Sequence, residues 1–237
     1  NPEKDVPQSF IRLVRFDVPY SEHNTRPAPT YDKKFTGSIT KQIRDFRTFI
    51  LESAFFEVYQ RRNPSGGFSE EPEYPTIAID ESVVNAVAHR DYGIGKPIHC
   101  FKYTDAFVVI SPGGIIQSVN IPEHFSLDNT HLEHHSRNPQ IMEWLRTMKD
   151  AHGRAFVQAL QEGTKRMREE MAKLGLSAPE YITTPLETRV ILYNNSASRK
   201  EISLAENADA PEFTNLYPLN GVPIEPDRDK RDHQKKE

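Results

Sequence analysis

The sequence predicts an α+β fold, a two-layer sandwich in which helices lie on one face of a mixed β-sheet. Hydrophobic residues alternate with polar ones in some segments, as in strands, and recur every three or four residues in others, as in helices. The segments follow one another as strand, helix, helix, hairpin, loop, helix, helix, hairpin, and this order favours helices packed on one face of a mixed sheet. A chain of 237 residues is long enough to bury a core.

The N-terminal part of the chain predicts one strand and one helix. Residues 9–18 alternate apolar and polar side chains and are expected to form a strand. Residues 20–37 are polar and rich in proline and turn-forming residues, so they are expected to form a loop. Residues 38–59 carry hydrophobic side chains at helical spacing, and Ser38 is suited to cap the start of that helix.

The central part predicts a loop, a helix and a hairpin. Residues 61–75 read as a loop, and the next helix is expected over residues 79–92, where Gly93 ends it. Residues 97–114 contain two segments of strand-forming residues around a short polar turn, which predicts a hairpin. Residues 115–138 show no clear period.

The C-terminal part predicts two more helices and a closing hairpin. Residues 139–151 and 155–175 have helical periodicity, and residues 180–193 have the pattern of two strands. After Asn194 the chain becomes polar and highly charged, as in a linker or flexible end. The predicted division is an N-terminal strand and helix (1–75), a core module (76–193) and a polar C-terminal linker or tail (194–237).

Composition narrows the classes of function. The net charge is −4 and the isoelectric point about 6.2, so no overall positive field indicates nucleic-acid binding. Cys100 is the single cysteine, which excludes an internal disulfide and fits a reducing compartment. The mean hydropathy is −0.67, and no run of 18 apolar residues predicts a transmembrane helix. Because the chain begins at Asn1 without a methionine or signal peptide, we expect a cytoplasmic piece of a longer protein.

The helix predicted at 79–92 carries a line of polar side chains on an otherwise apolar surface. Glu81, Asn85 and His89 share one helix face because they are spaced four residues apart. A nucleotide site needs a carboxylate that orients or deprotonates the attacking water, and a hard oxygen ligand for Mg²⁺. Glu81 and Asn85 can supply both. Spacing alone leaves a second interpretation open, in which Glu81 is a solvated first-turn residue and Asn85 a buried amide bonded to the backbone.

The surrounding motifs have a family resemblance. The segment DESVVNAVAHRDYG (80–93) resembles the first box of the GHKL (Bergerat-fold) ATP-binding superfamily, which includes histidine kinases, gyrase and MutL. It is most similar to the ATP-binding module of RecG-like and Schlafen-AlbA-type proteins, in which N-A-x-x-H-R-D-Y recurs. Matching motifs follow in the same order, and the resemblance extends over about residues 10–193. These further motifs are VVISPGGI (108–115), SRNPQIMEWL (136–145) and EGTKRMREEM (162–171).

The resemblance implies a Bergerat-type sandwich that binds ATP and Mg²⁺. In this family pattern Glu81 would be the general base and Asn85 the Mg²⁺ ligand. The nucleotide pocket would lie between the helix that carries them, the glycine-containing turn of the second motif and the start of the last helix. The residues implied to bind the cofactor are Asn85, His89, Ser111, Gly113, Gly114, Gly163 and Thr164.

Two departures from the family pattern leave two functions open. The superfamily's adenine-binding Asp is absent from the turn Ile110–Gly114, where Ser111 would replace it by a weaker contact or through a water. In the phosphate loop Gln161 replaces a glycine and Glu162 adds a negative charge, unless Gly163–Thr164 serve as the turn. The first function is an ATP-binding module with slow or switch-like ATPase activity. The alternative is a degenerate module without ATP turnover that dimerises or presents a surface to another protein.

The resemblance also implies partners outside this chain. Similar proteins often carry a Schlafen AlbA-type domain before the module and a winged-helix segment after it, and they are described as transcriptional regulators. We therefore expect nucleic acid to bind mainly through other domains, no membrane contact, and a homodimer as the assembly to test. The segment His131–His135 allows a metal site if it is helical, although solvated histidines in a mobile ATP lid are the alternative. Arg90 or Asp91 would pin the helix end and shape the pocket; the alternative is that the two residues form a purely structural pair.

Overall fold

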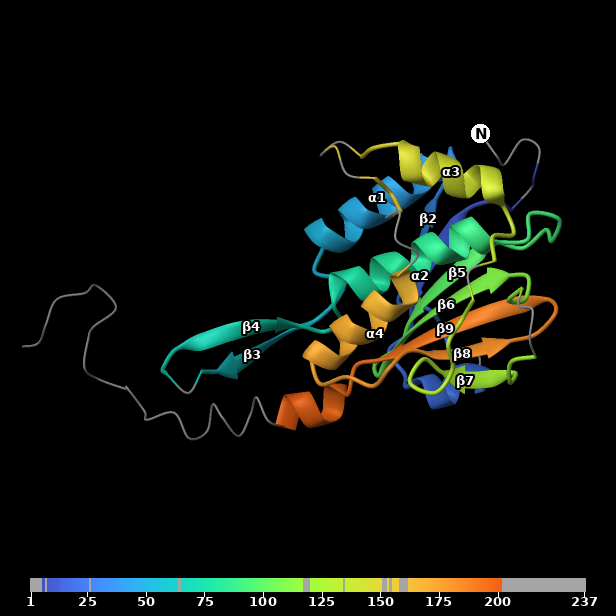
Figure 1. Cartoon of the computed structure of the whole chain (residues 1–237). Helices are drawn as coiled ribbons and strands as arrows, with labels where there is room; N and C mark the ends of the chain where they lie inside the picture. Colours follow the sequence, from blue (N-terminus) through green and yellow to red (C-terminus); the bar gives the residue numbers. More distant parts are fainter. Residues whose placement is uncertain are drawn as a thin grey trace, which may run out of the picture.

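The helices α1 to α4 lie on one face of a seven-stranded β-sheet, which confirms the predicted α+β sandwich (Figure 1). The computed structural model describes residues 6, 8–25, 27–63, 65–116, 120–133, 135–150, 153, 155–157 and 162–201. The strands of the sheet are β1 (Ile11–Arg15), β2 (Tyr31–Phe35), β5 (Ile98–Lys102), β6 (Ala106–Pro112), β7 (His124–Ser126), β8 (Glu180–Thr183) and β9 (Glu187–Tyr193). The helices are the 3₁₀ helix η2 (Tyr20–Thr25), α1 (Ile39–Glu52), α2 (Thr76–His89), α3 (Pro139–Thr147) and α4 (Gly163–Lys173). A separate hairpin consists of β3 (Val58–Arg62) and β4 (Phe68–Pro72).

The sheet is mixed, as predicted. Its strand order is β2-β1-β5-β6-β9-β8-β7, in which β1 runs parallel to β5 and every other neighbouring pair is antiparallel. The predicted strand at 9–18 contains β1, and the predicted hairpins at 97–114 and 180–193 are β5–β6 and β8–β9. Within the described residues, no helix is both long enough and apolar enough to span a bilayer.

The helix boundaries are partly corrected. The prediction of Ser38 as N-cap is confirmed, because its side chain accepts a hydrogen bond from the backbone N–H of Lys41 (3.3 Å). Helix α2 spans Thr76–His89 rather than residues 79–92. It starts directly after Pro75. At its C-terminus the side-chain amide of Asn138 donates hydrogen bonds to the backbone carbonyls of Ala88 and Arg90.

Several strands and two further helix boundaries differ from the sequence prediction. The expected loop at 20–37 contains η2 and β2, whose residues are mostly charged and sit at an edge of the sheet. The expected helix at 38–59 ends at Glu52, and the expected loop at 61–75 contains β4, the partner of β3. The short strand β7 lies within residues 115–138, where the sequence shows no hydrophobic periodicity. Helix α4 starts at Gly163, later than predicted, and residues 158–161 lie outside the described residues.

The two faces of the sheet are buried differently. Side chains alternate between faces along each strand, so each strand contributes to two separate layers. One layer packs under the helices, and its fully buried members include Ile11, Leu13, Cys100, Phe107 and Leu192. On the opposite face a smaller cluster around Val108 and Ile191 is covered in part by Phe16 and Tyr20.

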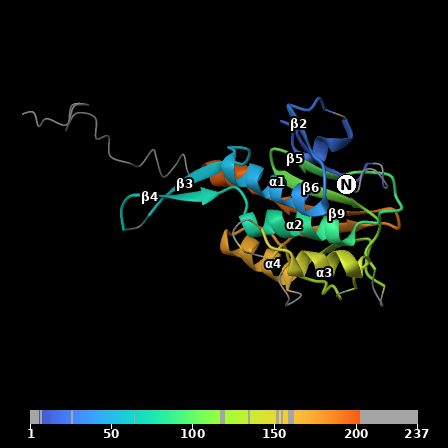
Figure 2. The same ribbon diagram turned by 90° about the horizontal axis from the view of Figure 1, so that it is seen from above.

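Helix α2 occupies the centre of the helical layer. Seen from above, it lies between α1 on one side and α3 and α4 on the other (Figure 2). Eight of its residues are buried: Ala78, Ile79, Ser82, Val83, Val84, Ala86, Val87 and Ala88. After Asp80, the residues of α2 that remain partly accessible are Glu81, Asn85 and His89.

The β3–β4 hairpin projects from this body and is fixed at its base by a buried carboxylate. Glu73 is fully buried, and its Oε1 atom lies 2.6 Å from the ammonium nitrogen of Lys102. The same oxygen accepts a hydrogen bond from the Asn194 amide, and Oε2 accepts one from the backbone N–H of Glu57 (2.9 Å). Asn194 is therefore part of the folded body, and a short helical segment follows it at 196–201. The division of the chain into three parts stays a prediction.

We expect Lys102→Met to lower the free energy of unfolding by about 3–5 kcal/mol, because it leaves the buried Glu73 carboxylate without its cation. Lys200→Met is the matched control, since Lys200 pairs with Glu57 at the surface and should cost about 1 kcal/mol or less. Urea unfolding of both variants measures the difference. Equal losses would contradict a stabilising role of the buried pair.

Candidate functional site

A pocket opens beside the accessible strip of α2 and brings together all the residues predicted for the site. It is bounded by α2, the end of β6, the segment that leads into α3 and the start of α4. The predicted residues that line it are Glu81, Asn85, His89, Ser111, Gly113, Gly114, Gly163 and Thr164. Their chemical roles stay predictions, whereas their common location is a feature of the fold.

The start of α4 lies directly against the carboxylate of Glu81. A Cβ atom placed on Gly163 would overlap a carboxylate oxygen of Glu81, so a side chain at this position would force the carboxylate to move. The first N–H groups of a helix lack intrahelical partners and carry partial positive charge. The pocket therefore combines a carboxylate from α2 with the positive end of α4.

The environment of Glu81 raises the pKa of its carboxyl group. Burial is the main cause, and the negative charge of Asp80 adds to it. Arg166, Arg47 and a hydrogen bond from Asn85 act in the opposite direction. Arg47 is itself held by Asp80, its guanidinium donating to Oδ2 at 2.7 Å. A carboxyl group whose pKa moves toward neutrality is better suited to accept a proton during catalysis.

The glycine turn after β6 is packed too tightly for side chains. Gly113 has φ +94°, and a Cβ there would lie 2.7 Å from the Cβ of Asp91. At Gly114 a Cβ would overlap the carbonyl oxygen of Thr184. The hydroxyl of Ser111 donates to the carbonyl of Ala86 (2.9 Å), so it is left with acceptor capacity on the pocket side. Ser111 thereby joins β6 to the middle of α2.

Three of the sequence motifs meet beside the pocket, at the C-terminal end of α2. Arg137 donates to the Asp91 carboxylate (3.2 Å) and to the carbonyl oxygen of Gly114 (2.8 Å). Asn138 donates to the carbonyls of Ala88 (2.9 Å) and Arg90 (2.8 Å). The motif that contains Arg137 and Asn138 thus connects the end of α2 with the glycine turn.

Arg90 is a structural residue and does not line the pocket. Its side chain is almost completely buried and donates to the carbonyl of Lys96 (2.6 Å) and to that of Gln8 (3.3 Å). Asp91 differs, because it holds Arg137 at the rim. The sequence left both residues open as pocket-shaping or structural, and the structure separates them.

Residues that sequence reasoning missed add positive charge to the pocket. Arg137, Arg146 and Arg166 all line it, from the segment before α3, from α3 and from α4. Arg166 follows Gly163 by three residues, so helical spacing could have placed it near Glu81. Thr188 on β9 also lines the pocket and donates to the Gly113 carbonyl (2.9 Å), but no sequence signal marked it.

The charges and glycines of the pocket fit an anionic ligand with a metal. Guanidinium groups and a helix N-terminus suit phosphate oxygens, and glycines allow close approach to the backbone. Glu81 and Asn85 offer hard oxygen donors, the type that Mg²⁺ prefers. Glu162 also lines the pocket with a negative charge, 3.5 Å from the ammonium of Lys165. Gln161, the other departure from the family pattern, lies outside the described residues.

The histidine-rich segment gives no support for a zinc site within the part of the chain that the structure describes. There, no group of three or more His, Cys, Asp or Glu side chains is placed to hold a metal ion. His135 lies 2.9 Å from a Glu133 carboxylate oxygen, and both residues line the pocket. His134 lies outside the described residues.

Comparison with known proteins supports the predicted resemblance. Residues 95–192 match the family described as "Putative ATP-dependent DNA helicase recG C-terminal", which covers the glycine turn and α4 but begins after α2. This match supports a GHKL- and RecG-like ATP-binding module; the Schlafen AlbA-type part of the prediction stays a prediction. No curated protein matches the chain.

A solved structure has a similar fold. The DIP2311 protein from Corynebacterium diphtheriae superposes with a TM-score of 0.61 at 20% sequence identity. The similarity covers 80% of this chain and 35% of that one, so this chain spans about a third of the solved protein. At this identity the likeness shows the fold.

We expect Glu81→Gln to change how stability depends on pH. Because the folded-state pKa of Glu81 is raised, the folded protein holds a proton that the unfolded chain has already lost. The wild type therefore loses stability as pH rises from the ordinary Glu pKa through the raised one, whereas the glutamine variant lacks this loss. Urea midpoints between about pH 4 and pH 8 should show the variant gaining relative to wild type. Glu162→Gln controls for removal of a pocket charge, and a pH-independent difference at position 81 would contradict the expectation.

Proposed function

We propose that the chain binds an adenine nucleotide with Mg²⁺ in this pocket and hydrolyses it slowly or as a switch. The observation that carries the proposal is the strip Glu81, Asn85 and His89, which stays partly accessible while every other residue of α2 after Asp80 is buried. All three residues line the pocket, so the strip brings a carboxylate, an amide and an imidazole to its wall. The match to a RecG-like ATPase family supports the same ligand class.

The chain's own residues suit the separate parts of a nucleotide. Arg137, Arg146 and Arg166 supply positive charge for phosphates, together with the start of α4. Asn85 would hold the metal through its amide oxygen, and the bound Mg²⁺ would neutralise charge on the phosphates. Glu81 would orient the attacking water and accept its proton, a task to which its raised pKa is suited.

The purine would lie against the glycine turn. Because the Ser111 hydroxyl already donates to Ala86, it can accept a hydrogen bond from an exocyclic amino group. Gly113 and Gly114 line the pocket with Ser111, so this turn would form the wall against which a flat ring packs. Ser111 would thus take part of the role of the missing Asp, directly or through a water.

The second candidate is a module that binds a nucleotide, or none, without turnover. The observation that favours it is the negative charge of Glu162 at the pocket wall beside Glu81, where phosphate would approach. In either case we place this chain within a larger regulatory protein whose nucleic-acid contacts lie in other domains. The net charge of −4 argues against tight duplex binding by this chain alone.

We expect calorimetric titration with a non-hydrolysable ATP analogue to show Mg²⁺-dependent binding by the full chain. The reason is the combination of three arginines, the α4 N-terminus and two oxygen donors in one pocket. Arg146→Met and Arg166→Met should each weaken binding, whereas Arg61→Met on the distant hairpin serves as control. No heat of binding at about 1 mM ligand, in protein that unfolds cooperatively, would exclude the proposal.

Substitutions at the α2 strip separate an ATPase from a binding module. Glu81→Ala should reduce hydrolysis by about 10²–10⁴-fold while analogue binding persists, because the side chain acts on the water. Asn85→Ala should weaken the Mg²⁺ dependence of binding instead. Phosphate release and titration, run side by side on both variants, measure the two effects. If the wild type binds ATP but releases no phosphate, the second candidate holds.

A further inference from the structure

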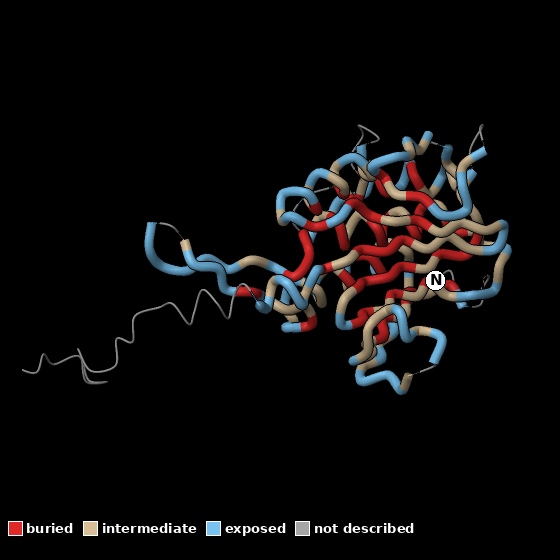
Figure 3. The backbone as a smooth tube through the Cα atoms, turned by 90° about the horizontal axis from the view of Figure 1, so that it is seen from below, coloured by how far each residue is buried: buried red, intermediate tan, exposed pale blue. Residues whose placement is uncertain are grey.

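The β3–β4 hairpin forms an arm outside the sheet and the helical layer. It extends away from the body, and most of it is exposed (Figures 1 and 3). Its two strands pair only with each other among the described residues, over the register Val58↔Pro72 to Arg62↔Phe68. A two-stranded hairpin is marginally stable by itself in water, and an exposed edge of this kind invites pairing with another chain.

The arm is held rigidly at its base. Arg199 donates to the carbonyls of Pro72 (2.8 Å) and Glu73 (2.8 Å), and its guanidinium lies 4.3 Å from the ring centre of Tyr59. The carboxylate of Glu73 is bound by Lys102 from the sheet. Because Glu73 directly follows β4, this buried ion pair fixes where the arm leaves the body.

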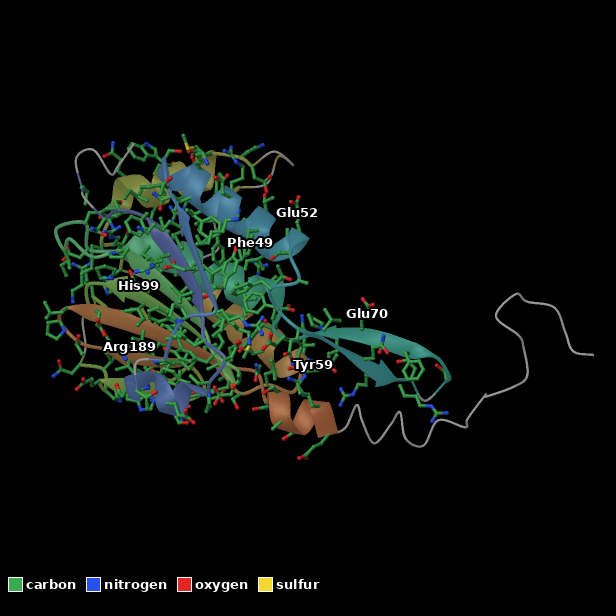
Figure 4. All side chains as sticks on the ribbon, turned by 180° about the vertical axis from the view of Figure 1, so that it is seen from behind. Phe49, Glu52, Tyr59, Glu70, His99 and Arg189 are labelled. Carbon is green, nitrogen blue, oxygen red and sulfur yellow. The ribbon has the colours of Figure 1, made fainter. Side chains whose placement is uncertain are left out.

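One face of the arm is occupied by the chain itself, and the other is not. Alternation along the strands puts Tyr59 and Glu71 on the first face, where Arg199 contacts both and Tyr59 is 7% exposed. The opposite face carries the apolar residues Val58, Phe68 and Pro72 at the two ends of the arm. The polar residues on this face are Gln60, Arg62 and Glu70. There Val58 is 58% exposed and Phe68 52% exposed, although both side chains are large and apolar. Figure 4 shows Tyr59 at the base of the arm and Glu70 farther out.

We infer that this second face binds the same face of a second copy of the chain, so that two arms pack together in a two-fold dimer. Val58 and Pro72 lie at the base of the arm and Phe68 near its tip. In a two-fold contact residue i meets residue j, and j meets i. Antiparallel packing of the arms therefore places each Phe68 on the Val58–Pro72 pair of the other copy. Two apolar clusters form, one at each end of the contact.

The charges of the arm favour a second copy over nucleic acid. Its strands carry Arg61 and Arg62 on β3 against Glu70 and Glu71 on β4, so acidic and basic groups balance. The face proposed for the contact carries one charge of each sign, Arg62 and Glu70, so two such faces bring no net charge together. An arm that binds duplex nucleic acid would need an excess of positive charge. The dimer is independent of the proposed nucleotide chemistry.

Sedimentation of the full chain over a concentration series tests the dimer. The wild type should show a monomer–dimer equilibrium, and Phe68→Asp should raise its dissociation constant about tenfold or more by placing a charge in each apolar cluster. Leu186→Asp is the matched control, because Leu186 is also exposed but lies in the β8–β9 turn away from the arm. A wild type that stays monomeric at about 100 μM overturns the inference. If duplex DNA binding, lost in Phe68→Asp, appears instead, the arm belongs to nucleic acid.

Cysteine pairing tests the register without relying on the variant's stability. Val58→Cys and Phe68→Cys proteins, mixed and oxidised, should give mixed disulfide dimers in excess over dimers of either variant alone. Cys100, the natural cysteine, does not compete, because it is fully buried and burial raises the pKa of its thiol. Equal yields of all pairs, or cross-linking no faster than for a Leu186→Cys control, overturn the face-to-face arrangement.

Discussion

The burial of α2 is the constraint on which the rest of the molecule depends. The helix packs on the sheet below, on α1 at one side and on α4 at the other, so its small and β-branched side chains leave little surface free. A buried helix cannot tolerate an unpaired charge. The only place where Glu81 can stay partly hydrated is the strip between α4 and the end of β6. The position of the pocket follows from the packing of this one helix.

Three glycines, Gly113, Gly114 and Gly163, allow the elements around the pocket to pack closely against α2 and β8–β9. Without a side chain at Gly163, α4 can approach until its first turn meets the Glu81 carboxylate. Without side chains at Gly113 and Gly114, the turn after β6 can lie against Asp91 and against the backbone at Thr184. Arg137 then connects the end of α2 to this turn, because it donates to the Asp91 carboxylate and to the Gly114 carbonyl. In this chain the motifs fit together because each fills space that another one leaves.

Burial decides which parts could be predicted from the sequence. Strands β1, β5, β6 and β9 bury one face or both, so their apolar patterns are plain. Strand β2 lies at an edge of the sheet, and its three central residues, Asp32, Lys33 and Lys34, are charged. Its sequence therefore lacks the hydrophobic pattern that predicts a strand. The arm buries almost nothing and has no pattern at all. At the site, the residues of α2 and the glycine turn were found from their motifs, whereas Arg146 and Thr188 reach the pocket through tertiary packing that spacing does not encode.

The arm and the pocket are joined by a very short stretch of chain. Strand β4 ends at Pro72, the anchored Glu73 follows, and α2 begins at Thr76. Because Lys102 and Asn194 hold Glu73 to β5 and to the end of β9, the arm, the sheet and the start of α2 are one rigid unit. A contact between two arms would therefore fix the orientation of two α2 helices, and of the pockets beside them, relative to each other. A change at the pocket could alter the dimer only by moving α2 against this anchor, which requires separating a buried, hydrogen-bonded ion pair. The fold thus favours a dimer whose geometry stays constant, with any switching confined to pocket-lining segments outside this unit, such as those at Glu133 and Glu162.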